Sequence, residues 1–196
     1  WGGYWGWDPV ENASLLPWIT ATAFLHSVMM QEKRGMMKVW NMVLVILTYT
    51  AAIFGTFLTR SGIVSSVHAF AQSSIGGYFL AFIILIVAGS FYLLYDRLSY
   101  LKTENTMESL VSRESGFMMN NLLFVAATFA VLFGTMLPVF SEWIQGVKVT
   151  VATPWFNTIM IPIGLGLLFM TGIGPLLAWR RSSPTSLKRA FLYPVT

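Results

Sequence analysis

The chain has 196 residues, of which 56% are hydrophobic and 10% charged, and it contains no cysteine. It is too apolar and too poor in charge for a soluble domain of this length, so lipid is the expected solvent. The lack of cysteine excludes disulfides and thiolate ligands within the chain, and membrane topology accounts for the net charge of +4, so we expect no nucleic-acid partner.

Five windows without a charged residue follow one another along the chain. They cover residues 12–31, 39–59, 61–95, 115–141 and 149–179. Each holds at least roughly the 20 residues that a helix needs to cross about 30 Å of hydrocarbon. We therefore predict an all-α fold, a polytopic transmembrane helix bundle of about five spans that forms a single domain over residues 1–196.

The first span has a readable start. Asp8, Pro9 and Glu11 match an N-cap, a first-turn proline and the acid of a capping box. This spacing suits a capping role for the two acids better than a general acid and base. The span is expected to end at the basic turn 31–35, and a second span is expected over residues 37–58.

A long outer loop is predicted over residues 59–77. An apolar stripe at helical spacing runs through this loop: Ile63, Val67, Phe70 and Ala71. The stripe predicts a short interfacial helix. His68 lies beside it.

The other three spans are expected over residues 78–95, 116–137 and 156–179. Between the first two of these, the alternating charges of residues 96–115 predict a solvated surface helix. Between the last two, an outer loop is expected to carry Trp143 and Trp155.

Lys and Arg are distributed unevenly between the two faces of such a bundle. With alternating spans, ten of the twelve share one face, and Arg60 and Lys148 fall on the other. The positive-inside rule assigns the face with ten basic residues to the cytoplasm. The N-terminal segment is therefore expected on the outer side.

The N-terminal segment places four large aromatic residues and three glycines among its first eight residues. An aromatic belt at the lipid headgroups is one interpretation, but a belt does not need glycines. Indole faces stack on a flat macrocycle while glycines let the backbone approach it, which favours haem. The candidate haem contacts are Trp1, Gly2, Gly3, Trp5, Trp7 and Asp8.

The chain has two histidines, at different membrane depths. His26 lies six residues before Glu32, in the inner half of the bilayer, where it either packs between helices or ligates iron. His68 is at the level of the tryptophans, as a surface residue or a second ligand. Arg60 either marks the end of a span or pairs with a haem propionate. One haem could not use both histidines.

The first eighteen residues, WGGYWGWDPVENASLLPW, resemble the signature of the WWD family of haem-handling cytochrome c biogenesis proteins. Their second half, ENASLLPW, is more similar to the large haem lyase branch of CcmF type than to the smaller haem-delivery branch. The resemblance continues through TAFLHS, around His26, and through GTFLTRSGIVSSVHAF, around Arg60 and His68.

This resemblance implies a haem lyase that joins haem vinyl groups to the CxxCH thiols of apocytochrome c. It implies that residues 1–18 hold the substrate haem with His68 as an iron ligand, and that His26 ligates a second, b-type haem. The implied partners are apocytochrome c, a haem chaperone, other cytochrome c maturation membrane subunits, and quinol as electron donor. The implied location is the bacterial inner (cytoplasmic) membrane, with the motif on the periplasmic side.

In the family, the partners of these two histidines lie before Trp1 and after Thr196. We therefore expect the chain to be the central fragment of a longer protein, active only with the rest of that protein and its partners. Two other function classes stay open: a haem transfer or binding module without ligation activity, and a structural membrane subunit.

Overall fold

The computed structural model describes residues 4–64, 66 and 74–192. Within these residues, five helices are long and apolar enough to cross a membrane. They are α1 (Pro9–Arg34), α2 (Lys38–Ser61), α3 (Gly76–Asp96), α4 (Arg113–Gln145) and α5 (Thr153–Ile173). The shorter helices are η1 (Leu98–Leu101), η2 (Gly174–Leu176) and α6 (Pro184–Phe191). The predicted all-α bundle of five spans is confirmed.

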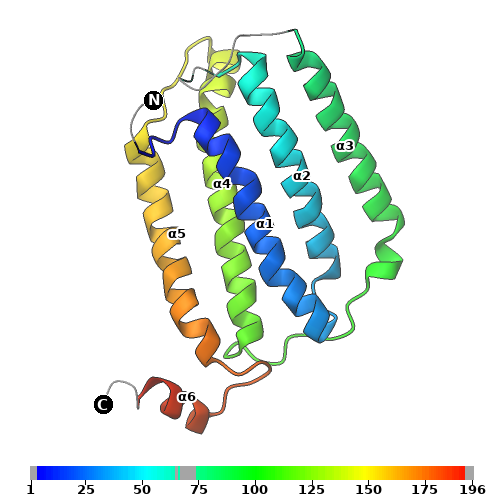
Figure 1. Ribbon diagram of the computed structural model, residues 1–196, viewed down its shortest axis with the longest axis vertical. Coiled ribbons are helices and arrows are strands. Elements are labelled where there is room, and N and C mark those ends of the chain that lie inside the picture. Colours follow the sequence, from blue (N-terminus) through cyan, green and yellow to red (C-terminus); the bar gives the residue numbers. More distant parts are fainter. Residues whose placement is uncertain (1–3, 65, 67–73, 193–196) are drawn as a thin grey trace.

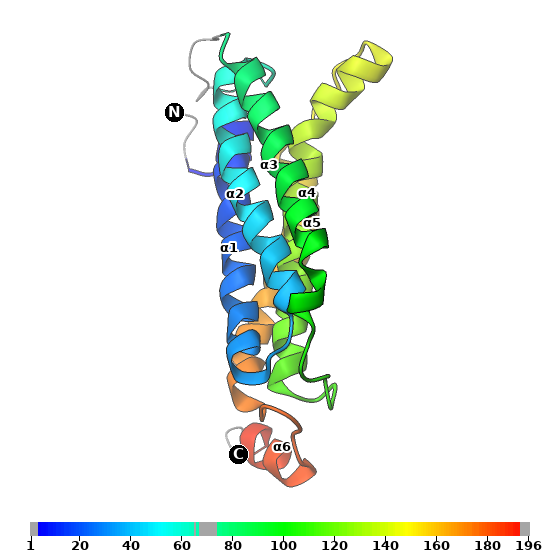
Figure 2. The same ribbon diagram turned by 90° about the vertical axis from the view of Figure 1, so that its right-hand side faces the viewer.

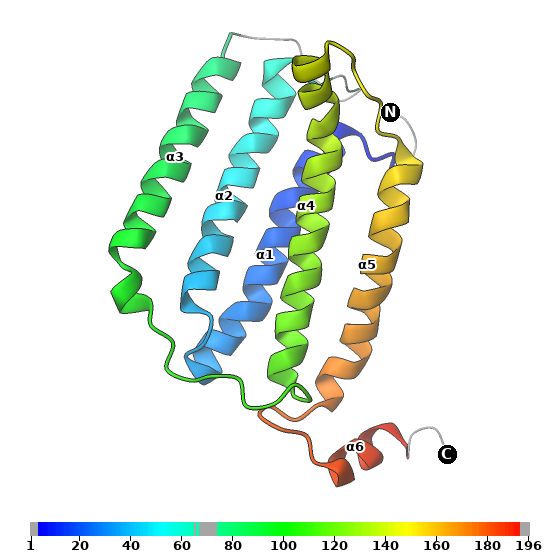
Figure 3. The ribbon, with the colours of Figure 1, turned by 180° about the vertical axis from the view of Figure 1, so that it is seen from behind.

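The five long helices stand side by side in the order α3, α2, α1, α4, α5 (Figure 1). Figure 3 shows the same order from behind. Each helix packs on the next, and α1 is the central member, in contact with α2 on one side and α4 on the other. Any feature that fixes α1 therefore fixes both halves of the bundle.

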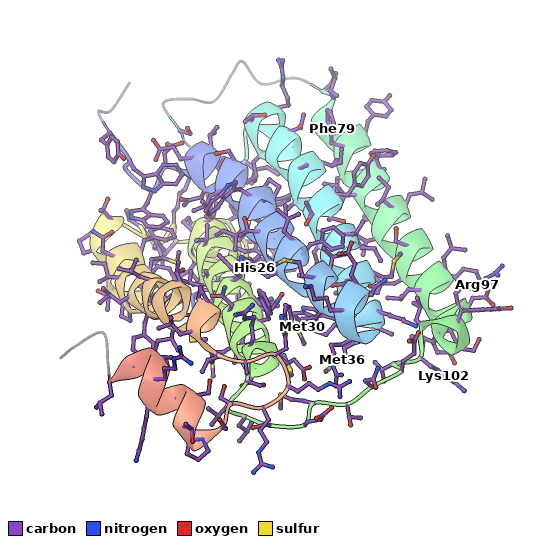
Figure 4. All side chains as sticks on the ribbon, turned by 60° about the horizontal axis from the view of Figure 1, so that its bottom comes forward. His26, Met30, Met36, Phe79, Arg97 and Lys102 are labelled. Carbon is purple, nitrogen blue, oxygen red and sulfur yellow. The ribbon has the colours of Figure 1, made fainter. Side chains whose placement is uncertain are left out.

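The two ends of the bundle differ in charge. We call the end where α1 stops and α2 starts the basic end, and the opposite one the motif end. The basic end carries Lys33, Arg34, Lys38, Arg97, Lys102, Arg113, Arg180, Arg181, Lys188 and Arg189. Figure 4 labels Arg97 and Lys102 there. The uneven charge distribution predicted from the sequence is thus present in the fold.

Local sequence signals set both ends of α1. Asp8 is its N-cap, Glu11 completes the capping box, and Pro9 occupies the first turn, as predicted. The helix stops at Gly35, whose φ of 62° lies in the left-handed region that glycine tolerates. The Gly35 N–H donates to the Gln31 carbonyl at 2.8 Å.

In the half of α1 nearer the motif end, polar side chains join this helix to both neighbours. Asn12 Nδ2 donates to Thr135 Oγ1 of α4 at 3.0 Å. Thr48 Oγ1 of α2 donates to Thr20 Oγ1 at 2.9 Å. Lipid tails are as apolar as leucine, so such hydrogen bonds and close packing hold membrane helices together.

Toward the basic end, polar side chains again join α1 to α2 and α4, and here they include charged groups. Ser27 Oγ donates to Asn41 Oδ1 of α2. Arg34 Nε lies 2.7 Å from Glu114 Oε1 of α4, and the two side chains are 7% and 0% exposed. A second contact, at 2.8 Å, joins Arg34 Nη2 to Glu108 Oε1. A buried ion pair therefore holds the end of α1 against α4.

The prediction of a surface helix over residues 96–115 is wrong. Helix η1 covers four residues of it, α4 begins at Arg113, and the residues between them form a loop along the basic end. Its acids pair with other helices, Glu104 with Lys38 at 2.6 Å and Glu108 with Arg34. These cross-links draw the loop along the ends of α1 and α2, which a helix would not allow. The hydrogen bond and charge of Lys38 lower the pKa of Glu104.

Three further boundaries differ from the prediction. Trp143 lies within α4 and Trp155 within α5, so neither is in a loop. Helix α4 continues past the apolar window to Gln145, and Figure 2 shows its polar end leaning away from the bundle. Pro138 lies inside this helix, where proline removes a backbone hydrogen bond and favours a bend. The segment predicted as a loop, 59–77, overlaps the last residues of α2, which ends at Ser61, and the first of α3, which begins at Gly76.

The buried ion pair yields a stability prediction. We expect Glu114→Gln to lower the free energy of unfolding by about 3 kcal/mol, because it leaves the buried Arg34 charge poorly compensated. Glu104→Gln, which breaks an exposed pair at the same end, is the matched control and should have a much smaller effect. Denaturation of the purified protein in detergent would measure both, and equal effects would contradict the assigned role of Glu114.

Candidate functional site

The aromatic segment lies at the motif end, directly before α1. Tyr4 is fully exposed and Trp5 is 40% exposed. The Trp5 ring meets that of Trp7 edge to face, with centroids 5.8 Å apart. The Gly6 N–H donates to Glu11 Oε2 at 3.0 Å, which ties the segment to the first turn of α1. Two aromatic rings are therefore available to a ligand on a backbone that is held in place.

Trp7 is anchored instead of open. Its Nε1 donates to Asn157 Oδ1 of α5 at 2.8 Å, and its ring stacks on Phe156 with centroids 5.0 Å apart and planes 7° apart. Asn12 Nδ2 donates to its carbonyl oxygen. The φ of Trp7 is 59°, a strained conformation for a bulky residue that persists only when surrounding contacts enforce it. Trp7 thus fixes where the segment leaves the bundle.

A glycine on α4 makes room for this anchor. A Cβ added to Gly134 would lie 2.7 Å from ring atoms of Phe156. The absence of a side chain there lets α5 approach α4 closely enough to seat the ring under Trp7.

Asp8 joins the segment to the outer loop. Its Oδ1 accepts from the Val10 N–H at 2.9 Å and from Ser66 Oγ at 2.5 Å. Glu11 Oε2 accepts from the Asp8 N–H at 3.1 Å. The predicted capping role of both acids is confirmed, and Asp8 has a second role as the attachment point of Ser66.

Several predicted site residues fall outside the described part of the chain: Trp1, Gly2, Gly3 and His68. The greater part of the predicted interfacial helix falls outside it too. Arg60 lies in the last turn of α2, at the motif end with Trp5 and Asp8. The structure therefore brings together Trp5, Trp7 and Asp8.

A cavity of about 250 Å³ lies beside this segment at the motif end. Its lining includes Pro9, Ile63, Val64, Pro138, Lys148 and Val149. Residues 148–151 were not among the predicted site residues. A usable signal was Lys148, one of two basic residues on this side of the bundle.

His26 lies in α1 toward the basic end, roughly 12 Å along the helix from Arg34, and Figure 4 labels it there. Its Nδ1 is 2.8 Å from the Thr22 carbonyl oxygen. Because a carbonyl only accepts, Nδ1 carries the proton and Nε2 keeps a free lone pair. This arrangement orients a metal-ligating histidine. Phe124 and Phe117 of α4 hold the ring at centroid distances of 5.6 and 5.9 Å.

The imidazole faces a cavity of about 270 Å³ between α1, α4 and α5. Its wall also includes Arg113, Gly116, Asn120, Met170 and Thr171. The volume is just below the roughly 300–1,000 Å³ of typical cofactor sites, so these helices form part of a wall and not a complete pocket. Asn120 Oδ1 is buried there without a hydrogen-bond partner among the described residues.

Within residues 4–64, 66 and 74–192, no three His, Cys, Asp or Glu side chains gather into a site for a bare metal ion. A porphyrin supplies four nitrogen ligands of its own and needs only one or two from the protein. An oriented imidazole on an apolar, aromatic wall fits a porphyrin iron better than a free ion.

Sequence reasoning missed Asn157, Phe156 and Ser66, which position the aromatic segment. Asn157 carried a signal, because an amide within the apolar window of the fifth span needs a partner. Phe156 and Ser66 carried none, since an aromatic in a span and a serine in a loop are both ordinary.

The fold and these two sites define a multi-pass membrane protein with an anchored aromatic segment at one end and an oriented histidine toward the other. Residues 1–65 match the family of cytochrome C assembly proteins. The chain is also similar over nearly its whole length to CcmF-type proteins of cytochrome c biogenesis.

Three similar proteins each match most or all of this chain. The chain is 44% identical over 182 residues to the cytochrome c-type biogenesis protein CycK of Bradyrhizobium diazoefficiens, covering 92% of the chain and 27% of the relative. It is 39% identical over 193 residues to the cytochrome c-type biogenesis protein CcmF of Escherichia coli, covering 98% and 30%. A solved structure of the cytochrome c haem lyase CcmF matches all of the chain and 28% of its own, with a TM-score of 0.74 and 32% identity. The chain thus spans less than a third of these relatives.

The Trp7 anchor yields a second prediction. We expect Trp7→Phe to destabilise the protein by about 1–3 kcal/mol, because the ring still stacks but Asn157 loses its donor inside the bundle. The double variant Trp7→Phe/Asn157→Leu should recover part of that loss, and Trp5→Phe is the control on the exposed ring. Detergent-phase unfolding measures these three variants, and a double variant no more stable than Trp7→Phe alone would contradict the coupling.

Proposed function

We propose that this chain is the haem-handling part of a cytochrome c haem lyase. It holds substrate haem at the outer, periplasmic face of a bacterial inner membrane while apocytochrome c is attached. The observation that carries the proposal is the aromatic segment, which Trp7 and Asp8 fix at the end opposite the basic residues and which leaves Tyr4 and Trp5 exposed. The relatedness to a named haem lyase supports it.

The chemistry needs little from the protein beyond positioning. Each thioether forms when a substrate thiol adds across a haem vinyl group, so that sulfur bonds to one carbon and the thiol hydrogen ends on the other. No electrons are gained or lost in this addition. Both thiols come from the CxxCH motif of apocytochrome c, which agrees with a chain that has no cysteine. Rings that hold the macrocycle flat, with an iron ligand such as His68, supply proximity and orientation.

His26 fits the second cofactor that this function requires. The bond from Nδ1 to the Thr22 carbonyl leaves Nε2 free toward a cavity with aromatic and apolar walls. If a b-type haem were held there by His26, it would supply one-electron transfer, with quinol as the electron source that would keep the substrate iron reduced. A haem chaperone and other maturation subunits are the further proposed partners.

A haem transfer or binding module without ligation activity is the second candidate function. The family that matches residues 1–65 is described as an assembly family, and that description does not specify ligation, which is compatible with this second function. Incubating the intact protein with apocytochrome c and reduced haem separates the two: a lyase produces thioether-linked haem that survives acid–acetone extraction, whereas a transfer module leaves haem extractable.

The membrane haem gives the third prediction. We expect His26→Ala to remove the b-type signal from the reduced-minus-oxidised spectrum of the purified intact protein, because the variant lacks an axial ligand. Leu25→Ala, on the exposed face of the same helical turn, is the matched control and should keep the signal. An unchanged haem spectrum in the His26 variant would leave this histidine with a packing role.

The outer site gives the fourth prediction. We expect His68→Ala to abolish c-type cytochrome assembly in cells, because the substrate haem loses an iron ligand, whereas a Phe in place of Trp5 only weakens it. Haem staining of membrane cytochromes after gel electrophoresis measures both, with Ile75→Ala in the same loop as control. Normal staining in the His68 variant would remove this histidine from the mechanism.

A further inference from the structure

An aromatic path leads from His26 to the basic end of the bundle. The His26 ring contacts Phe117 of α4, and the Phe117 ring lies 5.8 Å from that of Trp179. Two cations lie over the same indole: Lys33 Nζ at 4.7 Å and Arg113 Cζ at 5.2 Å from its centroid. The apolar cavity of His26 thus ends in a positively charged rim.

Arg113 links this rim to the cavity, because its side chain lines the wall that His26 also lines. Its Nη2 donates to the Pro175 carbonyl at 2.6 Å, and its Nε is buried without a hydrogen-bond partner. Among the residues that the structure describes, no carboxylate pairs with Arg113, since the neighbouring Glu114 is engaged by Arg34. A guanidinium beside an apolar cavity, with an unused donor and an uncompensated charge, favours an anionic ligand.

We propose that Arg113, assisted by Lys33, binds a carboxylate of the haem whose iron is ligated by His26. The proposal rests on the haem site proposed above. Phe117 and Arg113 are four residues apart on α4, so the Arg113 backbone lies about one helical turn, roughly 6 Å, nearer the basic end than that of Phe117, whose ring contacts His26. This offset matches a haem whose iron is at His26 and whose propionate edge points to the basic end.

A phospholipid headgroup is the competing anion, because Lys, Arg and Trp often gather at the membrane interface. The burial of Arg113 Nε and its place on the wall shared with His26 favour the haem carboxylate. Exposed Lys33 is the outer member of the pair and contributes less.

The test compares Arg113→Gln, Arg113→Lys and Lys33→Gln in the purified intact protein. Arg97→Gln is the control, because it removes an exposed cation at the same end, on the far side of the bundle. Three quantities are measured: the rate of haem loss to apomyoglobin, the midpoint potential, and the propionate-bending band in the resonance Raman spectrum. The last two report on the carboxylate and its charge, and a merely structural role of Arg113 would leave them unmoved.

We expect Arg113→Gln to lose haem roughly tenfold faster, the effect of one charge-assisted hydrogen bond. Its midpoint potential should fall, because a nearby positive charge favours the reduced iron, and its propionate band should shift. Lys33→Gln should change the same quantities less, and Arg97→Gln should change none. If Arg113→Gln does not fold, Arg113→Lys carries the test: it should keep haem but shift the band, since an ammonium cannot reproduce the planar fork.

Two results would overturn the proposal while leaving the haem site intact. In one, potential and propionate band match the wild type in both Arg113 variants although His26→Ala strips the haem. In the other, Arg113→Gln releases copurified phospholipid phosphate and leaves haem retention unchanged, which would identify a lipid headgroup as the ligand. Retention of the b-type signal in His26→Ala would instead defeat the underlying haem site, so the two failures are distinguishable.

Discussion

The bundle depends on a constraint of the lipid environment: apolar side chains gain little by leaving lipid for another helix, so polar contacts and close packing must fix the helices. On α1 these contacts form a buried stripe, Asn12, Thr20, Ser27 and Arg34, with each residue seven or eight positions after the last. That spacing is close to two helical turns, so the four side chains lie on one side of the helix. Their partners are on α4, α2, α2 and α4 in turn. One helix thereby sets the position of both neighbours.

The same helix connects the two candidate sites. The motif-end cap at Asp8 and the imidazole of His26 are eighteen residues apart, about 27 Å along α1. One haem cannot reach both, so the outer segment and the inner cavity act on separate cofactors if both handle haem. A rigid, well-capped helix keeps that separation constant, and it couples the outer loop, through Ser66 and Asp8, to the element that carries His26.

Signals local in sequence predicted much of this fold. Charge-free windows located five spans, and the Asp8 and Glu11 pair located the start of α1 to the residue. The prediction of a surface helix over residues 96–115 was wrong because it assumed that the charges of this segment pair with one another. Glu104 and Glu108 instead pair with Lys38 and Arg34 on other helices. Helix α4 is longer at both ends than predicted, because a charged residue ends a hydrophobic window but does not end a helix.

The candidate site was predicted less completely, and Trp5 and Trp7 explain why. Two positions apart in one motif, they received the same predicted role as stacking surfaces for a macrocycle. The structure separates them through Asn157 and Phe156, about 150 residues away along the chain, which hold the Trp7 ring against α5. A left-handed φ at an aromatic residue has no sequence signature either, because tertiary contacts alone enforce it.

The difference between the exposed Trp5 and the anchored Trp7 has a physical basis. A side chain that stacks on a substrate that comes and goes must keep an open face, and an open face cannot also hold its own backbone in place. Trp7 gives up its ring and its N–H to internal contacts, so the chain before it leaves the bundle in a fixed direction. Gly6, whose N–H is held by Glu11, adds no side chain between the two indoles. Trp5 therefore keeps an exposed face on a backbone that is held in place, which suits the proposed stacking on a flat ligand.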